Sequence, residues 1–123
     1  MSSAKALLAL DPATATGWVY AGFNPDNAGP VVLAHGVYNL EKHRFEGQGM
    51  AYLRLLGGLR NTMQITKPDA VVFEEVPAHK GVHAAHVYGA ITGNIMLVCD
   101  QEEVPYGPVP IATWKKLATG KGN

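Results

Sequence analysis

The stretch KALLALD, from Lys5 to Asp11, is a continuous apolar run that ends on an acid. Such a run is typical of a β-strand buried on both faces, because neither face alternates with polar residues. The same pattern returns in AVVFEEV, from Ala70 to Val76, which carries two glutamates near its end. The sequence therefore predicts two buried strands with carboxylates at their carboxyl ends.

Between and after these strands, the sequence predicts three further strands and two helices. GWVYAGF (Gly17–Phe23) and PVVLAHGVYNL (Pro30–Leu40) flank a turn-forming segment and are rich in β-branched and aromatic residues, which predicts an antiparallel hairpin. Apolar residues at helical spacing predict helices over Gly49–Met63 and His83–Cys99. VPYGPVP, from Val104 to Pro110, is interpreted as a short final strand whose prolines favour a sheet edge.

This order of elements constrains the topology. A helical crossover between two parallel strands is right-handed in nearly all sheets. The simplest arrangement places the strand of Ala70–Val76 beside Lys5–Asp11 and parallel to it. We therefore expect an α/β fold in a single domain over residues 1–123: a five-stranded mixed sheet, made of a three-strand antiparallel meander plus two parallel strands, flanked by helices. Thr113 is expected to cap a short helical turn after the last strand.

The composition is that of one globular domain. A chain of 123 residues with 47% hydrophobic residues can bury a single core. Its longest apolar run, Ile95–Cys99, is too short to span a bilayer, and the start of the chain lacks the pattern of a signal peptide. Cys99 is the only cysteine and lies in an apolar helical pattern. We therefore expect a reduced core thiol, no membrane partner and a cytoplasmic location.

The net charge of zero argues against a dedicated nucleic-acid binder, but the average conceals two stretches without acids. The stretch from Val76 to Cys99 contains Lys80 and three histidines. The stretch after Glu103 contains the basic residues Lys115, Lys116 and Lys121. Each stretch can carry a positive local potential.

Adjacent strands would bring Asp11 close to the Glu74–Glu75 pair. Neighbouring carboxylates repel each other, so each is costly to ionise unless a cation joins them. Mg²⁺ accepts carboxylate oxygens, and two such ions about 4 Å apart can activate a water on one side of a phosphodiester and stabilise the leaving oxygen on the other. Because Glu74 and Glu75 point to opposite sides of a strand, only one of them can share the site with Asp11. The alternative is that Asp11 only begins a turn and the glutamates only cap a strand.

Three segments together resemble the RuvC family of Holliday junction resolvases, most closely the short forms carried by bacteriophages. They are LALDPATATGWVY, VVFEEVPAHKGVHAAHVYGAITGN and VPYGPVPIATWKKLATGKGN, which follow one another in the family order and cover nearly the whole chain. The resemblance implies the RNase H-like fold, a homodimer and a structure-selective endonuclease. Such an enzyme hydrolyses DNA phosphodiesters at Holliday junctions (four-way junctions) or other branched DNA by a two-metal-ion mechanism. The resemblance also implies Mg²⁺ as the cofactor, with Mn²⁺ as a substitute, inside a bacterial cell.

By position, the resemblance makes Asp11 the first metal ligand and Glu74, rather than Glu75, the second. Lys115 matches a basic position near the DNA, and Lys80 and Lys121 are expected to hold further backbone phosphates, an interaction that depends on salt but not on base sequence. The family takes its last one or two acids from the helix after the Thr-Gly-Lys-Gly segment, where this sequence ends. We therefore expect a C-terminally incomplete nuclease domain, inactive if truncated. The alternative is a catalytically silent module that binds branched DNA.

Another acid is needed to complete such a site. Glu46 is a candidate, because the predicted third strand ends near the same edge of the sheet as Asp11; the alternative is a solvated acid in the first turn of a helix. Three further acids are excluded because the second helix carries the chain back to the opposite edge: Asp100, Glu102 and Glu103.

Two groups on the second predicted helix allow more than one interpretation. One group has the spacing of a transition-metal site on a helix face, but its members can equally contact phosphate or belong to the surface: His79, His83 and His86. The other is a line of small residues that can pack either on the sheet or on a second subunit: Ala85, Gly89 and Gly93.

The positions of the aromatic residues bear on how the chain would contact DNA. Some RuvC-like proteins place a wedge aromatic just after the second acid, where this chain has Val76-Pro77, so any wedge must lie elsewhere. Trp18 and Trp114 are expected in the core or half-buried rather than against bases.

A third functional class, besides the nuclease and the silent DNA-binding module, is a fragment of an actin-like ATPase. It fits poorly because PATATG after Asp11 contains a single glycine.

Overall fold

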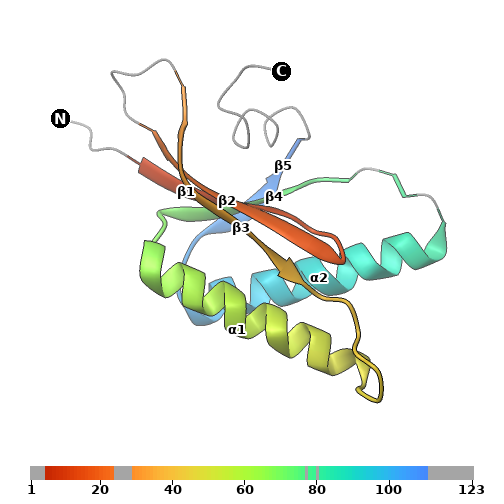
Figure 1. Ribbon diagram of the computed structural model, residues 1–123. Coiled ribbons are helices and arrows are strands. Elements are labelled where there is room, and N and C mark those ends of the chain that lie inside the picture. Colours follow the sequence, from red (N-terminus) through yellow and green to blue (C-terminus); the bar gives the residue numbers. More distant parts are fainter. Residues whose placement is uncertain (1–4, 24–28, 77, 80, 111–123) are drawn as a thin grey trace.

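The predicted first strand is β1 (Lys5–Asp11), and it lies at the centre of a five-stranded sheet with the strand order β3-β2-β1-β4-β5 (Figure 1). The computed structural model of the chain describes residues 5–23, 29–76, 78–79 and 81–110. The other elements in this part of the chain are β2 (Ala15–Phe23), β3 (Val31–Asn39), α1 (Gln48–Thr66), β4 (Ala70–Glu74), α2 (Val82–Gln101) and β5 (Tyr106–Val109). The predicted turn of helix from Thr113 lies outside the described residues.

The pairing of the strands confirms the predicted fold class. β1 pairs antiparallel with β2, and β2 pairs antiparallel with β3, which forms the meander. β4 is parallel to both β1 and β5. β5 is an edge strand, as its prolines predict. β4 ends at Glu74, two residues before the predicted end, because its partners end there too: Glu74 pairs with Val109, the last residue of β5.

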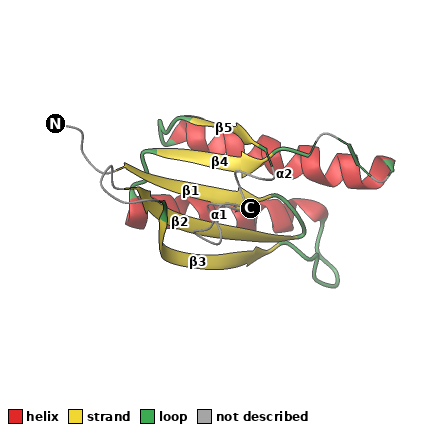
Figure 2. Cartoon of the chain, turned by 90° about the horizontal axis from the view of Figure 1, so that it is seen from above, coloured by secondary structure: helices red, strands yellow, loops and turns green. Residues whose placement is uncertain are grey.

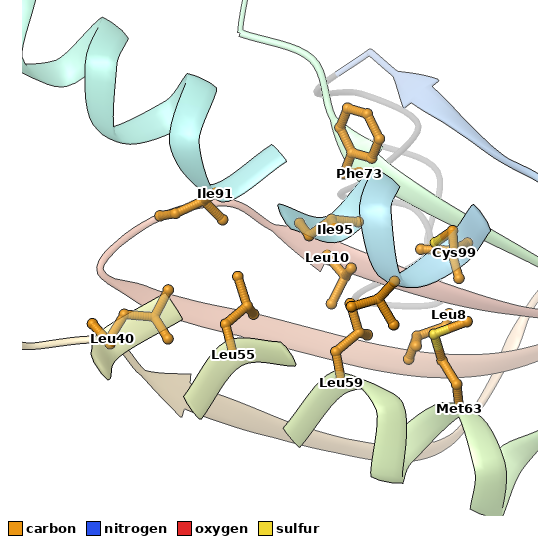
Figure 3. Close-up of a cluster of buried hydrophobic side chains, with 13 residues drawn as sticks. Leu8, Leu10, Leu40, Leu55, Leu59, Met63, Phe73, Ile91, Ile95 and Cys99 are labelled. Carbon is orange, nitrogen blue, oxygen red and sulfur yellow. The ribbon is translucent and has the colours of Figure 1, made fainter. Parts of the chain in front are cut away.

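Both helices cover one face of the sheet, and the core lies between them and the strands (Figures 2 and 3). The strand residues Leu8, Leu10 and Val71 are fully buried in this layer. They meet Leu55 and Leu59 of α1, and the same cluster includes Ile91, Ile95, Val98 and Cys99 of α2. Side chains alternate along a strand. The residues next to Leu8 and Leu10 in β1, and next to Val71 in β4, therefore point to the opposite face of the sheet. We call this opposite side the far face of the sheet.

Two residues that the sequence places in the core, Cys99 and Trp18, are buried in it or packed against it. Cys99 is a fully buried free thiol, as expected, and burial raises its pKa to about 11. Trp18 packs against the core and stacks on Tyr38, with ring centroids 6.1 Å apart. Gly36 is required beside this indole, because a Cβ there would come within 2.7 Å of Trp18. Trp114 lies outside the described residues.

Helix α1 continues three residues beyond its predicted end at Met63 and stops at Thr66. Lys67 adopts a left-handed backbone conformation with φ 49°, and its N–H bonds to the carbonyl of Met63, which closes the last turn. The Tyr20 hydroxyl donates to the carbonyl of Thr66, 3.0 Å away, which satisfies one of the free carbonyls at this helix end. Asp69 then accepts a hydrogen bond from the N–H of Ala6, 2.7 Å away, and so ties the start of β4 to β1.

Helix α2 is more apolar than its buried face requires. Among the described residues it is the one helix long and apolar enough, by length and composition only, to cross a membrane. Ile91, Ile95 and Val98 explain much of this character, because they fill the core. Part of the outward surface is also apolar, with Leu97 47% and Val82 70% exposed.

Candidate active site at the ends of β1 and β4

Asp11 and Glu74 are the last residues of two neighbouring parallel strands. The register pairs Leu7 with Ala70 and Leu10 with Phe73, so the next step along both strands brings Asp11 beside Glu74. The predicted adjacency of the two strands is thus confirmed. Both carboxylates are half-buried at the same edge of the sheet.

The direction of the two side chains follows from the core. Leu10 and Phe73 both point toward the helices, where they are buried. Their successors Asp11 and Glu74 therefore both point to the far face. Glu75 follows the end of β4, and its N–H bonds to the carbonyl of Val109, 2.7 Å away. If the alternation of the strand continues to Glu75, its side chain lies on the side opposite Asp11 and Glu74. The role of Glu74 as the second metal ligand stays a prediction.

The neighbour of Asp11 on β2 is a glycine. Asp11 pairs with Gly17 of β2, so these two residues share the far face. A Cβ built on Gly17 meets no described atom within 4 Å. The connection between them is held by Thr16, whose buried hydroxyl donates to the carbonyl of Ala13. Among the described residues, the β2 neighbour of Asp11 thus contributes no side chain beside the Asp11 carboxylate.

Helix α2 fixes the position of Glu74 through Tyr88. The Tyr88 hydroxyl donates to the backbone carbonyl of Glu74, 2.9 Å away. Burial raises the pKa of this phenol, and the charges of Glu75 and Glu74 act in the same direction, so it stays protonated as a donor. His79 packs on the Tyr88 ring, with centroids 4.9 Å apart. The sequence marks Tyr88 only as an apolar helical position, because nothing local indicates a hydroxyl partner fourteen residues away.

The donor set fits a hard divalent cation. Asp11 and Glu74 offer carboxylate oxygens, the ligands that Mg²⁺ and Mn²⁺ prefer. Within residues 5–23, 29–76, 78–79 and 81–110, no group of three or more His, Cys, Asp or Glu side chains is arranged to hold a metal ion. The described part of the site therefore contributes two carboxylates.

Glu46, the predicted additional acid, is engaged elsewhere. Its carboxylate accepts the N–H of His43 at 2.7 Å and pairs with the Arg54 guanidinium of α1, with 2.9 Å between Nη1 and Oε1. These contacts, the backbone hydrogen bond first, lower its pKa. The loop that carries Glu46 connects β3 to α1, on the helix side, whereas Asp11 points to the far face. A ligand role for Glu46 stays a prediction, and its visible contacts serve the loop.

The three excluded acids lie where the sequence predicts. The Tyr106 hydroxyl, at the start of β5, donates to Asp100, 3.0 Å away. Glu102 pairs with Arg60 in the second half of α1, at 3.7 Å. Because β5 starts at the edge opposite Asp11, these acids lie at the far end of the sheet from the carboxylate pair.

The basic residues predicted to hold DNA lie outside the described part of the chain: Lys80, Lys115 and Lys121. Of the three histidines, His79 packs on Tyr88, and His83 and His86 are exposed on the first turns of α2. His83 lines two hollows. One of about 330 Å³ lies between the turn after β1 and the start of α2, and another of about 410 Å³ is also lined by Lys42 and His86. The histidines therefore form no metal site with other described residues, and all three border hollows beside the strand ends.

The small-residue line of α2 is open. Gly89 and Gly93 are exposed, and a Cβ built on either meets no described atom within 4 Å. Packing of these glycines on the sheet, one of the two alternatives, is therefore wrong, because the face of α2 that meets the sheet is the one with Ile91 and Ile95.

Among the solved structures that superpose on this chain are Holliday junction resolvases. Thermus thermophilus RuvC in complex with a Holliday junction substrate superposes with a TM-score of 0.79 at 18% identity, covering 97% of this chain and 71% of that one. A second T. thermophilus RuvC structure gives 0.77 at 18% identity over 96% and 71%. This chain has the RuvC-like form of the RNase H-like fold.

The yeast mitochondrial Holliday junction resolvase Ydc2 shares the RuvC-like fold, with a TM-score of 0.62 at 14% identity, over 95% of this chain and 57% of that one. No protein-family model and no curated sequence matches this chain. The likeness is thus one of backbone architecture, and function has to be argued from the site.

Proposed function

We propose that this chain is a structure-selective endonuclease that hydrolyses DNA phosphodiesters at branched DNA such as four-way junctions. The observation that carries the proposal is the register of β1 and β4, which ends both strands on acids that share one face of a RuvC-like fold. Carboxylates so close together repel each other unless a cation joins them. The neighbouring structure in complex with a Holliday junction supports branched DNA as the substrate class.

Asp11 and Glu74 are the residues that would hold Mg²⁺ or Mn²⁺. Bound there in a two-ion arrangement, the metal supplies Lewis-acid stabilisation of the scissile phosphate and an activated water. The protein positions the acids: β1 and β4 fix the spacing of the two carboxylates, and Tyr88 holds the Glu74 backbone. Gly17 places no side chain beside Asp11 on β2, which would favour the approach of a phosphate group. Lys80, Lys115 and Lys121 are proposed to hold the DNA backbone in a salt-dependent way.

The second candidate is a catalytically silent module that binds branched DNA. It is favoured by the two-carboxylate donor set in the described residues, because the resemblance implies one or two more acids. A labelled four-way junction incubated with the protein and Mg²⁺ or Mn²⁺ separates the candidates. Nicked product that requires Asp11 supports the nuclease; a shifted but intact junction supports the silent module; no binding contradicts both.

A homodimer is proposed to form along α2. Glycines spaced four apart on a helix allow the backbone of a second helix to come close, and Leu97 adds apolar surface to the same outward side. Gly89→Lys should convert a dimer to a monomer in sedimentation analysis, whereas Gly89→Ala should leave it a dimer or raise its stability, since alanine favours the helix. A wild-type chain that sediments as a monomer contradicts this assembly.

The cytoplasmic location and the absence of a membrane partner stay predictions.

A further inference from the structure

Phe45 is the most exposed large apolar side chain in the described part of the molecule, at 93%. It lies in the loop of residues 40–47, between β3 and α1, in the turn of residues 43–46. The N–H of Glu46 bonds to the carbonyl of His43, 3.3 Å away, which closes this turn. A ring so exposed buries almost none of its apolar surface within the described part of the chain, so that surface is open to a ligand.

The backbone of Phe45 is strained as well. Its φ is 70°, in the left-handed region, at the third position of a turn where glycine or asparagine is usual. A bulky residue there is a true outlier, and such strain persists only where the surroundings enforce it. A glycine at this position would relieve the strain and remove the exposed ring together. The chain instead carries an aromatic ring.

The loop holds this strained turn rigidly. Glu46 accepts the N–H of His43 and pairs with Arg54, and Arg54 also donates to the carbonyl of Glu41, 2.8 Å away. The N–H of Leu40 bonds to the carbonyl of Thr14 at 2.7 Å. Thr14 belongs to the turn that follows Asp11, so the loop leaves the sheet at the edge that carries the two carboxylates (Figure 1).

The surroundings of the ring are polar and mostly cationic. The Arg44 guanidinium lies over the Phe45 ring, 4.8 Å from its centroid. Lys42 and His43 are exposed beside it, and Glu41 is the one exposed acid in the loop, since Glu46 is paired with Arg54. An apolar protein partner would have to strip water from these charges, which is costly. A flat ring beside cations suits a nucleic acid, which offers a base to stack on and phosphates for the cations.

We propose that Phe45 stacks on an exposed nucleobase of the DNA, while Lys42 and Arg44 hold the neighbouring phosphates. The inference rests on the proposed function and adds to it the element that distinguishes unpaired bases at a branch from an intact duplex. A rigid turn favours such binding, because little conformational freedom is lost when the base arrives. The chain thereby carries an aromatic contact on this loop rather than after the second acid.

The test is a binding titration with a four-way junction that carries 2-aminopurine at its branch point, in EDTA so that no cleavage interferes. Wild type should change the 2-aminopurine fluorescence on binding. Phe45→Ala should abolish that change and raise the junction Kd about 5- to 100-fold, the range of one lost base stack, with under twofold change on an intact duplex. Phe45→Trp should retain both signals. Ile65→Ala is the matched control, because Ile65 is 73% exposed at the other end of α1.

The outcomes separate this inference from the proposed function. If wild type binds and cleaves the junction but Phe45→Ala binds it within twofold of wild type, the stacking role is wrong and the nuclease proposal stands. Equal weakening on junction and duplex also overturns it, as does Phe45-dependent binding to anionic vesicles without binding to DNA. A wild-type protein that binds no DNA overturns both proposals. Phe45→Ala should fold normally, since the ring is almost wholly exposed, and urea unfolding verifies this.

Discussion

The strand ends and the 40–47 loop lie at one edge of the sheet but are built by different means. Asp11 and Glu74 are positioned by the backbone register of buried strands, so their spacing is set by the core. Phe45 is positioned by a loop that polar contacts hold, namely a turn hydrogen bond and the Glu46–Arg54 ion pair. Its own backbone is strained in this turn. The proposed catalytic acids are therefore on the strands of the sheet, and the proposed contact for recognition is on a loop held by hydrogen bonds.

Because the two regions are built differently, we expect substitutions in them to affect different properties of the protein. At the strand ends, a change of one atom in a carboxylate should remove chemistry and leave the fold intact. At the loop, a change of the whole side chain should alter recognition and leave chemistry intact.

Asp11→Asn and Glu74→Gln should each lower junction cleavage by at least about a thousandfold, equal to about 4 kcal/mol, with the junction still bound. The amide keeps the shape of the side chain but removes the negative charge that holds a cation. Cleavage is measured on a labelled junction with Mg²⁺ in excess.

Glu75→Gln is the matched control for this pair of variants. It removes the same charge one residue away, on a side chain that points away from Asp11, and should change cleavage by less than about threefold. Equal losses in Glu74→Gln and Glu75→Gln would show that the strand register does not select the catalytic glutamate.

Leu10→Ala tests the scaffold behind the carboxylates. Leu10 is fully buried between β1 and the helices, one residue before Asp11 (Figure 3). Its truncation should lower the free energy of unfolding by about 3 kcal/mol, through lost burial and the cavity left behind. Urea unfolding measures this loss. A loss below about 1 kcal/mol would mean that the strand end is not held by the core.

Glu46→Gln tests the bracing of the loop and should have a smaller, pH-dependent effect. The pKa of Glu46 is lowered from 4.5, so its carboxylate stabilises the fold above the unfolded pKa and loses that contribution as the pH falls below about 4.5. Wild type should therefore be more stable than the variant at pH 7, and the two should converge toward pH 3. Thermal unfolding at both pH values measures it; a difference that does not depend on pH would contradict the ion pair.

Much of the arrangement of the strand ends can be predicted from sequence because it depends on strand patterning. The apolar runs before Asp11 and Glu74 indicate buried strands, and alternation indicates that only one of Glu74 and Glu75 can share a site with Asp11. The choice of Glu74 over Glu75 comes from the resemblance to the RuvC family and stays a prediction. The order of elements then brings the two acids together, since a right-handed crossover leaves few topologies. These inferences use periodicity, which is a local property of the chain.

The loop could not be predicted in the same way. A left-handed Phe45 contradicts the turn preferences that a sequence analysis uses, because glycine or asparagine is expected there. The Glu46–Arg54 pair joins a loop to a helix, and the Tyr88–Glu74 hydrogen bond joins a helix to a strand end. Neither has a local signature. Recognition elements of this kind become visible only when exposure and backbone angles are known.

Phe45→Gly compared with Phe45→Ala gives the smallest effect and separates the strain from the ring. Both variants remove an almost wholly exposed side chain, so neither loses much buried surface. Only glycine adopts a φ of 70° without cost, so Phe45→Gly should be more stable than Phe45→Ala by about 1 kcal/mol, as measured by urea unfolding. Both should bind the junction equally weakly. Phenylalanine at this position costs stability relative to glycine, and the proposed stacking on a base gives the ring a role. Equal stability of the two variants would contradict a strained turn.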